Sequence, residues 1–428
     1  MHVIHDDLLP LYMTYTSLCL GNVTHCATKY KLAFSDEGEY GSLLKWYNIF
    51  SNSEPILLHK ASKETIICFD ESKVGLSATS LWFQYGFGKP QGPIKDSLLN
   101  GYHVRQFSEY VLEKFGIPSS PKLRSERSIV FFSRKINRRI LNEDEMLKMM
   151  QSAYQTTFSS NIIPQIYNLD LATNNTKDIL IHLTESETVV GMHGSAMILS
   201  MFMRPGSVVV ELFPFGINPQ HVSPIKAMCK LQDISLIYRS WVNTKEENTV
   251  TYPNAEALLG GISHLPLPEQ EQIASLTEIP AVECCHNAAY LFRMFQDTIV
   301  DNSLSAVLRG AFLGKKMYSI ETFYENTLEH MLSKWYFPAP VTNISCRYSS
   351  DNQTITIMWD PPVNTKNPHY NIAVVSNIKQ FSTILRKPEL TWPVPSVLHD
   401  IDKIDVWIKS TEKGKESIDS YFQCNVVI

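Results

Sequence analysis

The sequence predicts an α/β protein that ends in an all-β module, and three observations support this prediction. Strand, helix and strand patterns follow one another between Lys122 and Trp241. From Val341 onward, short segments alternate apolar and polar residues, which is the period of half-buried strands. The chain has 428 residues, of which 44% are hydrophobic, so it is long enough for two or three domains with buried cores.

Residues 1–120 are predicted to form the first domain. The letters DLLPLYMTY, which start at Asp7, indicate a helix around Pro10, and ETIICFD (Glu64–Asp70) indicates a strand. A helix is expected over Val104–Gly116, closed by its final glycine. The opening residues MHVIHDDLLP are too polar for a secretory signal, and we expect that further sequence precedes them.

Residues 121–337 are predicted to form a parallel α/β domain with a helical tail. Strand–helix–strand units of this length imply parallel pairing and a Rossmann-like fold. The expected elements are a strand within Arg127–Lys135, a helix over Asn142–Tyr154 with Asn142 as N-cap, a strand within Glu187–Gly194, an apolar helix over Ser195–Met203, a strand over Ser207–Pro214 and a tail from Asn287 to Trp335.

Residues 338–428 are predicted to form a β sandwich. Strands are expected at Thr354–Trp359, Tyr370–Val375 and Lys403–Ser410, and Asp360-Pro361-Pro362 breaks the first of them. About ninety residues with seven or so strands are typical of an immunoglobulin-like sandwich, and the arrangement resembles a fibronectin type III module. An unrelated small β domain is the alternative.

Composition narrows the classes of function and the compartment. The formal net charge is −5, so we expect no nucleic-acid partner, and no apolar run approaches the ~20 residues of a membrane-spanning helix. The eight cysteines form no CxxC pair; an even count suits disulfides in an oxidising lumen, although cytosolic thiols would look the same. N-glycosylation sequons, which favour the secretory pathway, begin at Asn22, Asn174, Asn343 and Asn352.

A glycine-bounded turn between a strand and a helix is the most informative motif. Gly194 lets the backbone turn closely, and a helix that starts at Ser195 offers free amides to an anion. His193 lies at the mouth of this turn and could donate to a diphosphate. Glu211, at the end of the next strand, could hold the paired hydroxyls of a ribose. The alternative is a tight turn with a satisfied histidine and a glutamate at a solvent edge.

Two further clusters are candidates for chemistry. Arg134, Arg138 and Arg139 follow a predicted strand, and guanidinium groups suit phosphate oxygens, although a solvated basic turn would look similar. His2 and Asp6 are four residues apart, so on a helix they share a face and could supply a general base. A capping cluster at a helix start is the alternative there. A metal site is not expected, because Cys284-Cys285-His286 is poorly spaced for zinc.

Together these residues resemble the pattern of glycosyltransferase family 61. The matching stretches are SRKINRRILNEDE from Ser133, VVGMHGSAMILSMFMRPGSVVVELFP from Val189, and His2-x-x-x-Asp6 with Leu9-Pro10. Within the family, INPQHVSPIKAM, YRSWVNTKEENTVTYP, GGISHL and the terminal module look closest to members that act on protein-linked mannose. Ser195-Ala196 stands where many relatives have Ala-Gly or Ala-Gln.

The resemblance implies an inverting transferase of GT-B type, with two Rossmann-like domains, the first incomplete here, before a fibronectin type III sandwich. It implies transfer of N-acetylglucosamine from UDP-GlcNAc to the 4-hydroxyl of mannose on a protein such as dystroglycan, in the endoplasmic reticulum lumen. It also implies a membrane anchor of the kind that relatives carry, which we expect to find outside these 428 residues. The donor-binding residues would be Arg134, Arg139, His193, Gly194, Ser195 and Glu211, and His2 or Asp6 would be the base.

Because arginines and a helix end would carry the donor charge, we expect no metal or other cofactor. Two other functions stay open. One is a transferase of the same family that adds N-acetylglucosamine to Ser or Thr of EGF-type repeats. The other is a catalytically inactive binding relic.

Overall fold

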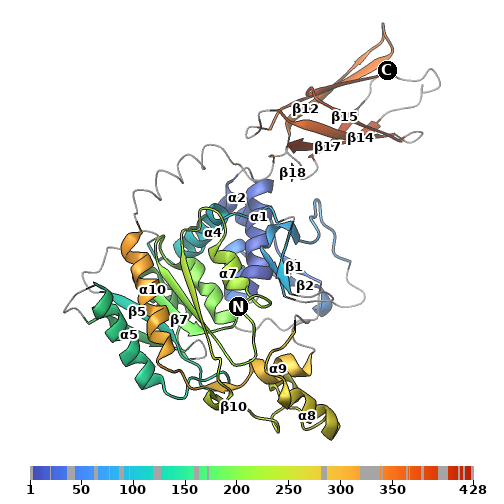
Figure 1. Ribbon diagram of the computed structural model, residues 1–428. Coiled ribbons are helices and arrows are strands. Elements are labelled where there is room, and N and C mark those ends of the chain that lie inside the picture. The colour runs from blue at the N-terminus through green and yellow to red at the C-terminus, as the bar shows by residue number, and fades with distance from the viewer. Residues whose placement is uncertain are drawn as a thin grey trace. The chain divides into compact units, whose positions relative to one another are not determined.

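The structure is a computed structural model (Figure 1). It describes residues 3–19, 21–35, 44–61, 66–76, 78–85, 91–95, 97–118, 127–158, 163–170, 173–280, 287–318, 338, 341–362, 365, 367–376, 380–393, 403–412, 415–417 and 420–425. The chain divides into two compact units, Met1–Leu9 with Ser77–Glu329 and Pro10–Leu76 with His330–Ile428. Residues 1–120, predicted as one domain, therefore contribute to both units.

The first unit is built on a five-stranded parallel sheet, with the strand order β6-β5-β7-β8-β9. Its strands are β5 (Ser128–Phe132), β6 (Gln165–Leu169), β7 (Thr188–Met192), β8 (Val208–Phe213) and β9 (Ile237–Val242). Every residue of β5, β7 and β8 is buried, because a parallel sheet is covered on both faces. The predicted parallel pairing of these segments is confirmed.

Helices cover both faces of this sheet. On one face α5 (Glu143–Phe158) packs beside α10 (Ser303–Met317), and both enclose a core that includes Phe131, Val210 and Leu308 (Figure 1). On the other face lie α4 (Gly101–Lys114), α6 (Thr176–Glu185) and the 3₁₀-helix η6 (Ser195–Phe202). Successive residues of a strand point to opposite faces, so Glu211 in β8 points away from the Phe131 core and toward the η6 side.

Two local predictions in this unit have different outcomes: one is confirmed and one needs correction. The apolar helix expected from Ser195 is present over Ser195–Phe202, and its hydrogen bonding is that of a 3₁₀-helix. Asn142 precedes α5 as predicted, but its side-chain oxygen accepts a hydrogen bond from the Val300 amide at 2.9 Å, and its amide group donates to the Val300 carbonyl. It therefore ties the start of α5 to the segment before α10, because a long-range backbone partner takes the place of the local cap.

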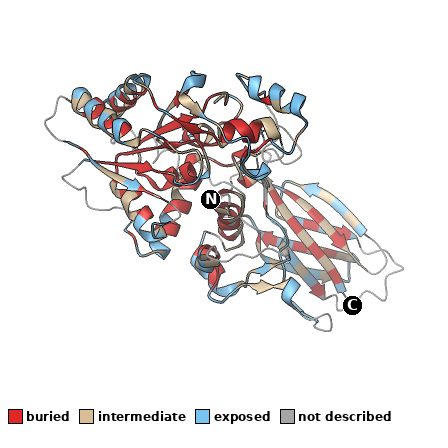
Figure 2. Cartoon of the chain, turned by 90° about the horizontal axis from the view of Figure 1, so that it is seen from below, coloured by how far each residue is buried: buried red, intermediate tan, exposed pale blue. Residues whose placement is uncertain are grey.

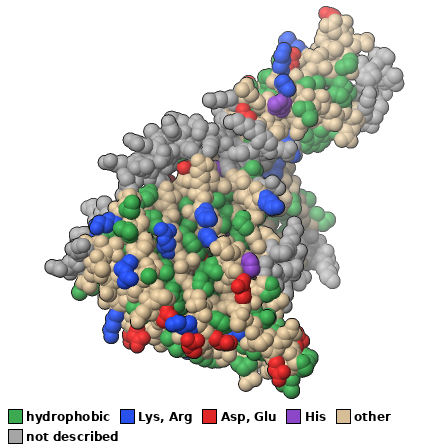
Figure 3. All heavy atoms as spheres, viewed as in Figure 1, with side chains coloured by type: hydrophobic (Ala, Val, Ile, Leu, Met, Phe, Trp, Pro, Cys, Tyr) green, Lys and Arg blue, Asp and Glu red, His purple; other side chains and the backbone are tan. Residues whose placement is uncertain are grey.

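Smaller helices complete the first unit around the sheet. Their bounds are α7 (Pro224–Cys229), η7 (Glu246–Asn248), η8 (Ala257–Leu259), α8 (Leu267–Ser275), α9 (Ala288–Met294) and η5 (Ala78–Ser80). Two short two-stranded sheets join β3 (Phe83–Gln84) to β4 (Gly92–Pro93), and β10 (Thr249–Val250) to β11 (Asp297–Thr298). On the face shown in Figure 3, most acidic side chains lie toward the lower edge, and basic side chains are spread over the rest of the described surface.

The residues before 119 contain little sheet. A π-helix, η1 (Ile4–Leu8), runs into α1 (Leu9–Leu18), and the later elements are α2 (Val23–Lys29), β1 (Ala33–Phe34), α3 (Leu44–Tyr47), η3 (Asn48–Phe50), β2 (Ile56–Leu57) and η4 (Leu58–Lys60). The strand predicted over Glu64–Asp70 is absent from its described residues 66–70, where Ile66 is 88% exposed. β-branched residues raise strand propensity, but no strand in the described part of the chain pairs with this segment. The Rossmann-like first domain stays a prediction.

Among the described residues, no helix has the length and apolarity to cross a lipid bilayer.

The second unit contains the predicted all-β module. One sheet joins β12 (Thr342–Ser349), β13 (Thr354–Asp360) and β16 (Glu389–Pro393). The other joins β15 (Gln380–Leu385), β14 (His369–Val375), β17 (Lys403–Glu412), β18 (Lys415–Glu416) and β19 (Ser420–Asn425). Buried and more exposed residues alternate along the strands (Figure 2), and the buried set from both sheets forms one core. A disulfide between Cys346 and Cys424 joins β12 to β19.

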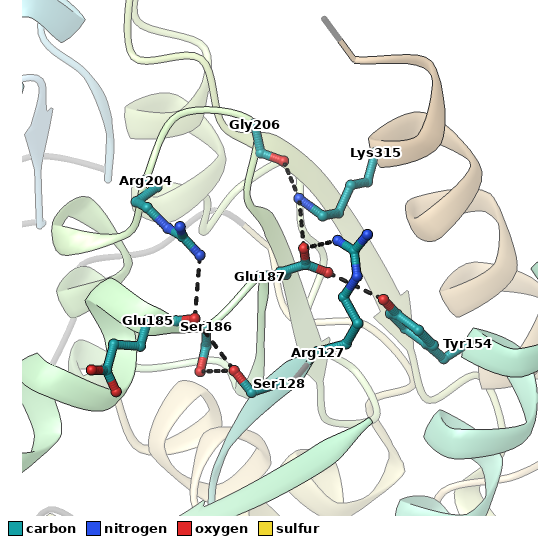
Figure 4. A network of polar contacts seen from close by, with 9 residues as sticks. All are labelled: Arg127, Ser128, Tyr154, Glu185, Ser186, Glu187, Arg204, Gly206 and Lys315. Carbon is teal, nitrogen blue, oxygen red and sulfur yellow. Dashed lines mark hydrogen bonds and ion pairs between the residues drawn. The ribbon is translucent and has the colours of Figure 1, made fainter. Parts of the chain in front are cut away.

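A polar network holds the helices to the amino ends of β5 and β7 (Figure 4). Glu187 contacts Arg127 and Lys315 through one carboxylate oxygen and accepts a hydrogen bond from the Tyr154 hydroxyl through the other. Lys315 also donates to the Gly206 carbonyl. Tyr154 belongs to α5 and Lys315 to α10, so the network anchors both helices. It lies at the sheet edge opposite the carboxyl ends of the strands.

Candidate functional site

The sheet order defines a crevice. β5 and β7 are neighbours in the sheet, although β6 lies between them in sequence and pairs with β5 on its other side. Connections therefore leave β5 and β7 in opposite directions, and the carboxyl ends of these strands form a topological switch point. Open α/β sheets bind ligands at such a point. The segments that follow the two strands here begin at Ser133 and His193.

Two arginines meet at Gly194, just beyond β7. A Cβ atom on Gly194 would lie 2.6 Å from Nη1 of Arg138 and 3.3 Å from Nη1 of Arg134. Gly194 also has a φ of 151°, a backbone conformation that L side chains rarely adopt. Glycine is therefore required twice, for the turn and for the approach of the guanidinium groups. The structure thus places Arg134, one of the expected donor-binding residues, beside the glycine turn.

Backbone and amide oxygens hold both guanidinium groups. Arg138 Nη1 donates to the His193 carbonyl at 2.8 Å, and its guanidinium lies over the Phe295 ring. Arg134 donates to the carbonyl and side-chain oxygens of Asn137 at 3.1 and 3.0 Å. Burial lowers the pKa of Arg134, an effect that the charge of Asp170 opposes. Two positive charges with N–H groups thus converge where a phosphate could bind.

Three cavities share lining residues around this point. The first, of 220 Å³, is lined by residues that include Arg134, Asp170 and Ser195. The second, of 210 Å³, is lined on its polar side by Arg138, His193 and Gly194, and Ser195 also borders it. A third cavity of 660 Å³ shares Ile136 and Asn137 with the first and Phe295 with the second. Ser195 is exposed at the start of η6, where free amides and the helix dipole favour an anion.

Glu211 lies behind His193 and is not at a solvent edge. It is fully buried, its Oε1 is 2.7 Å from Nδ1 of His193, and its Oε2 accepts a hydrogen bond from the Tyr238 hydroxyl at 2.6 Å. The predicted contact between Glu211 and a ribose is therefore corrected, because both oxygens are already engaged and neither faces solvent. Tyr238 was missed. It lies two residues before Ser240, which pairs with Glu211, and only the strand register reveals that it faces the same side.

Arg139 lies apart from Gly194. Its guanidinium pairs with Asp297, and Nη2 donates to the Tyr252 hydroxyl at 2.8 Å, so it borders the 660 Å³ cavity. Arg138, its neighbour in sequence, takes the place beside the glycine turn. Arg138 has a φ of 52°, which turns consecutive arginines to different sides. No pattern in the sequence distinguishes the two residues.

The predicted general base is partly described. His2 lies outside the described residues. Asp6 belongs to η1 and contacts Nδ1 of His5, at 2.5 Å. His5 is fully buried, and its ring meets Trp82 and Tyr85 edge-on. Tyr85 lines the 210 Å³ cavity together with His193, so this aromatic contact brings η1 close to that cavity.

Two disulfides are present among the described cysteines, Cys19–Cys26 and Cys346–Cys424. Cys284, Cys285 and His286 lie outside the described residues. Within the described ranges, no group of three or more His, Cys, Asp and Glu residues is arranged to hold a metal ion. The four sequon asparagines are all exposed, as glycan attachment requires: Asn22, Asn174, Asn343 and Asn352.

The fold and the site define a class of protein: a doubly wound parallel α/β domain whose switch point is lined for an anionic ligand. The glycosyltransferase 61 family model matches residues 2–210. Protein O-linked-mannose beta-1,4-N-acetylglucosaminyltransferase 2 of Danio rerio is 32% identical over 415 residues, which cover 90% of this chain and 68% of that protein. The chain belongs to the glycosyltransferase 61 family.

Relatives of the same name in other vertebrates are similar at the same level. The protein of Xenopus laevis is 34% identical over 374 residues, and that of Homo sapiens is 33% identical over 376 residues. In both cases the match covers 86% of this chain and 60% of the relative. The chain thus spans less than two thirds of the length of these two relatives.

Proposed function

We propose that this chain is an inverting glycosyltransferase that moves N-acetylglucosamine from UDP-GlcNAc to the 4-hydroxyl of O-linked mannose on a protein. One observation carries the proposal: Arg134, Arg138 and His193 surround Gly194 at the switch point of the parallel sheet. The names of the relatives supply the sugar and the linkage. An O-mannosylated protein of the dystroglycan type is the proposed acceptor.

The site would act mainly on the leaving group. As the bond between the sugar and UDP breaks, negative charge grows on the diphosphate. Arg134, Arg138 and the amides at the start of η6 are already in place to stabilise that charge. Preorganised donors of this kind typically contribute on the order of 10²–10³ in rate each. Because guanidinium groups supply this positive charge, we propose that no metal cofactor is needed.

The acceptor hydroxyl must lose a proton as it attacks the anomeric carbon from the face opposite UDP. Asp6 and His2 are the proposed bases. Asp6 is 29% exposed and is held by His5, which fixes the carboxylate for such a role. Inversion follows from a single displacement, so no covalent intermediate with the enzyme is required.

We further propose that the chain has the GT-B architecture with a terminal fibronectin type III module. The three-stranded and five-stranded sheets of the terminal module support a fibronectin type III sandwich. A second Rossmann-like lobe would complete a GT-B enzyme. The two disulfides and four exposed sequons support the endoplasmic reticulum lumen as the compartment, with membrane attachment through an N-terminal anchor like that of its relatives.

The test is turnover of UDP-GlcNAc with three acceptors: an O-mannosyl peptide, the same peptide without mannose, and a folded EGF-type repeat. We expect transfer to the O-mannosyl peptide alone, with inverted β linkage, and unchanged rates in EDTA. Arg134→Ala should lower kcat/KM by roughly 10²-fold or more. Arg309→Ala is the matched control, because Arg309 is an exposed arginine of α10.

Each alternative has its own result. Transfer to the EGF-type repeat would favour the other transferase activity of the family. Binding of UDP-GlcNAc without transfer to any acceptor would indicate a binding relic. Near wild-type activity of Arg134→Ala would contradict the proposed site.

A further inference from the structure

A buried chain of polar groups runs behind the candidate site on three adjacent strands. Tyr238 in β9 donates to Glu211 in β8 at 2.6 Å, and Glu211 contacts Nδ1 of His193, just beyond β7, at 2.7 Å. Glu211 is fully buried and His193 is 5% exposed. The His193 ring also stacks on Phe213, with 19° between the ring planes. These contacts fix both the position and the tilt of the imidazole.

This series of hydrogen bonds determines which ring nitrogen of His193 can contact a ligand. Glu211 accepts a hydrogen bond at each oxygen, from the Tyr238 hydroxyl and from His193 Nδ1–H. Burial and the charge of Glu211 raise the pKa of Tyr238 far above neutral pH, so this hydroxyl stays a donor. Because Nδ1 is engaged, Nε2 is the nitrogen that His193 can offer to the 210 Å³ cavity.

The charges near Glu211 influence whether His193 is protonated. A fully buried carboxylate is costly unless a positive group or several donors compensate it. Among the described residues, the titratable or charged groups near the pair include Tyr238 from β9, Cys229 from α7, and Arg138 and Arg134 from the loop after β5. Burial raises the pKa of the Cys229 thiol, so it stays neutral, and Arg138 bonds to the His193 carbonyl, not to Glu211. A protonated His193 would therefore supply the missing positive charge.

A diphosphate bound in the 210 Å³ cavity would also favour a protonated His193, because it places negative charge near Nε2 of the ring. A neutral imidazole with Nδ1–H presents a lone pair at Nε2, which repels a phosphate oxygen, whereas an imidazolium presents an N–H donor. We propose that His193 takes up one proton from solvent at Nε2 when the donor diphosphate binds, and that Glu211 and Tyr238 are positioning residues that make this uptake possible. The only bond formed is Nε2–H, which then donates to a phosphate oxygen. The inference rests on the proposed function.

The experiment is calorimetric titration of the full chain with UDP-GlcNAc, without acceptor, in two buffers of different ionisation enthalpy. The difference in apparent heat gives the protons taken up per ligand. Histidine ordinarily gains its charge between pH 5 and 8, so we expect about one proton at pH 8 and fewer at pH 6. The diphosphate of UDP-GlcNAc has no group that titrates in this range, so it adds nothing to the count.

Variants separate positioning from folding. Glu211→Gln keeps a hydrogen-bond acceptor without the charge, and should abolish the uptake at pH 8 and raise Kd roughly 10- to 100-fold. His193→Gln should also show no uptake. Tyr238→Phe keeps the carboxylate and should keep the uptake, with a loss of affinity of roughly tenfold or less. Arg309→Ala should match wild type in both measurements.

The outcomes separate this inference from the proposed function. Binding by wild type with no uptake at pH 8, or equal uptake by wild type and His193→Gln, would overturn the inference and leave the transferase proposal intact. Failure of wild type to bind UDP-GlcNAc would refute both. If Glu211→Gln does not fold by circular dichroism, His193→Gln still decides whether the proton goes to this histidine, and Tyr238→Phe decides whether the chain behind it tunes affinity.

Discussion

Substitution of Gly194 by alanine tests whether the glycine turn and the arginines form one site. The φ of 151° is almost exclusive to glycine, so alanine there costs about 1–3 kcal/mol of strain. The new Cβ would lie 2.6 Å from Nη1 of Arg138, which forces the guanidinium away from the His193 carbonyl. A hydrogen bond to a charged group contributes about 1.5–3 kcal/mol. The expected loss of stability is therefore about 2.5–6 kcal/mol.

Urea unfolding and titration with UDP-GlcNAc measure the two consequences separately. Gly194→Ala should lower the free energy of unfolding by that amount, and weaken donor binding roughly 10- to 100-fold. Gly310→Ala is the matched control. It lies in α10 with no atom within 4 Å of a new Cβ, so alanine should raise stability by about 0.5–1 kcal/mol.

The Arg138→Ala background separates the backbone strain at residue 194 from the collision of its new Cβ with the Arg138 guanidinium. In that background the guanidinium is gone, so Gly194→Ala should cost only the backbone strain, about 1–3 kcal/mol. Wild-type stability and wild-type donor affinity in Gly194→Ala would refute the reasoning. Equal costs in both backgrounds would show that Arg138 does not crowd the turn.

Two further predictions concern stability. Glu187→Ala leaves Arg127 and Lys315 without their carboxylate and should lower the free energy of unfolding in urea by about 2–4 kcal/mol. The control is Lys73→Ala, at an exposed pair with Glu71, which should cost under about 1 kcal/mol. Equal effects of the two substitutions would contradict the anchoring role of the network. Hydrogen bonds from Ser303 and Lys245 lower the pKa of Asp301, so its contribution is present above about pH 4 and is lost as the pH falls further. Asp301→Asn should therefore be less stable than wild type by about 0.5–1 kcal/mol at pH 7 and equal to it near pH 2, and a difference that persists at pH 2 would contradict this.

Local pattern was enough to place three strands of the parallel sheet, β5, β7 and β8, and three strands of the terminal module, β13, β14 and β17. Strands such as β7 and β8 are mostly apolar along their length, and those of the terminal module alternate, because burial on two faces or one face leaves these signatures in sequence. The glycine turn could also be predicted from the sequence, because a glycine between a buried strand and an apolar segment usually marks a turn. The strand expected at Glu64–Asp70 failed because propensity alone does not supply a pairing partner.

The sequence by itself determined that a histidine–glycine turn and a run of arginines would follow buried strands of one α/β domain. Only the tertiary structure decided that Arg138, and not Arg139, reaches Gly194, and that Glu211 is enclosed between His193 and Tyr238. The physical reason is that periodicity is local, whereas strand order and register are settled by contacts between residues far apart in the chain. Those contacts turn side chains that are neighbours in sequence to different cavities, and bring distant ones within hydrogen-bond reach.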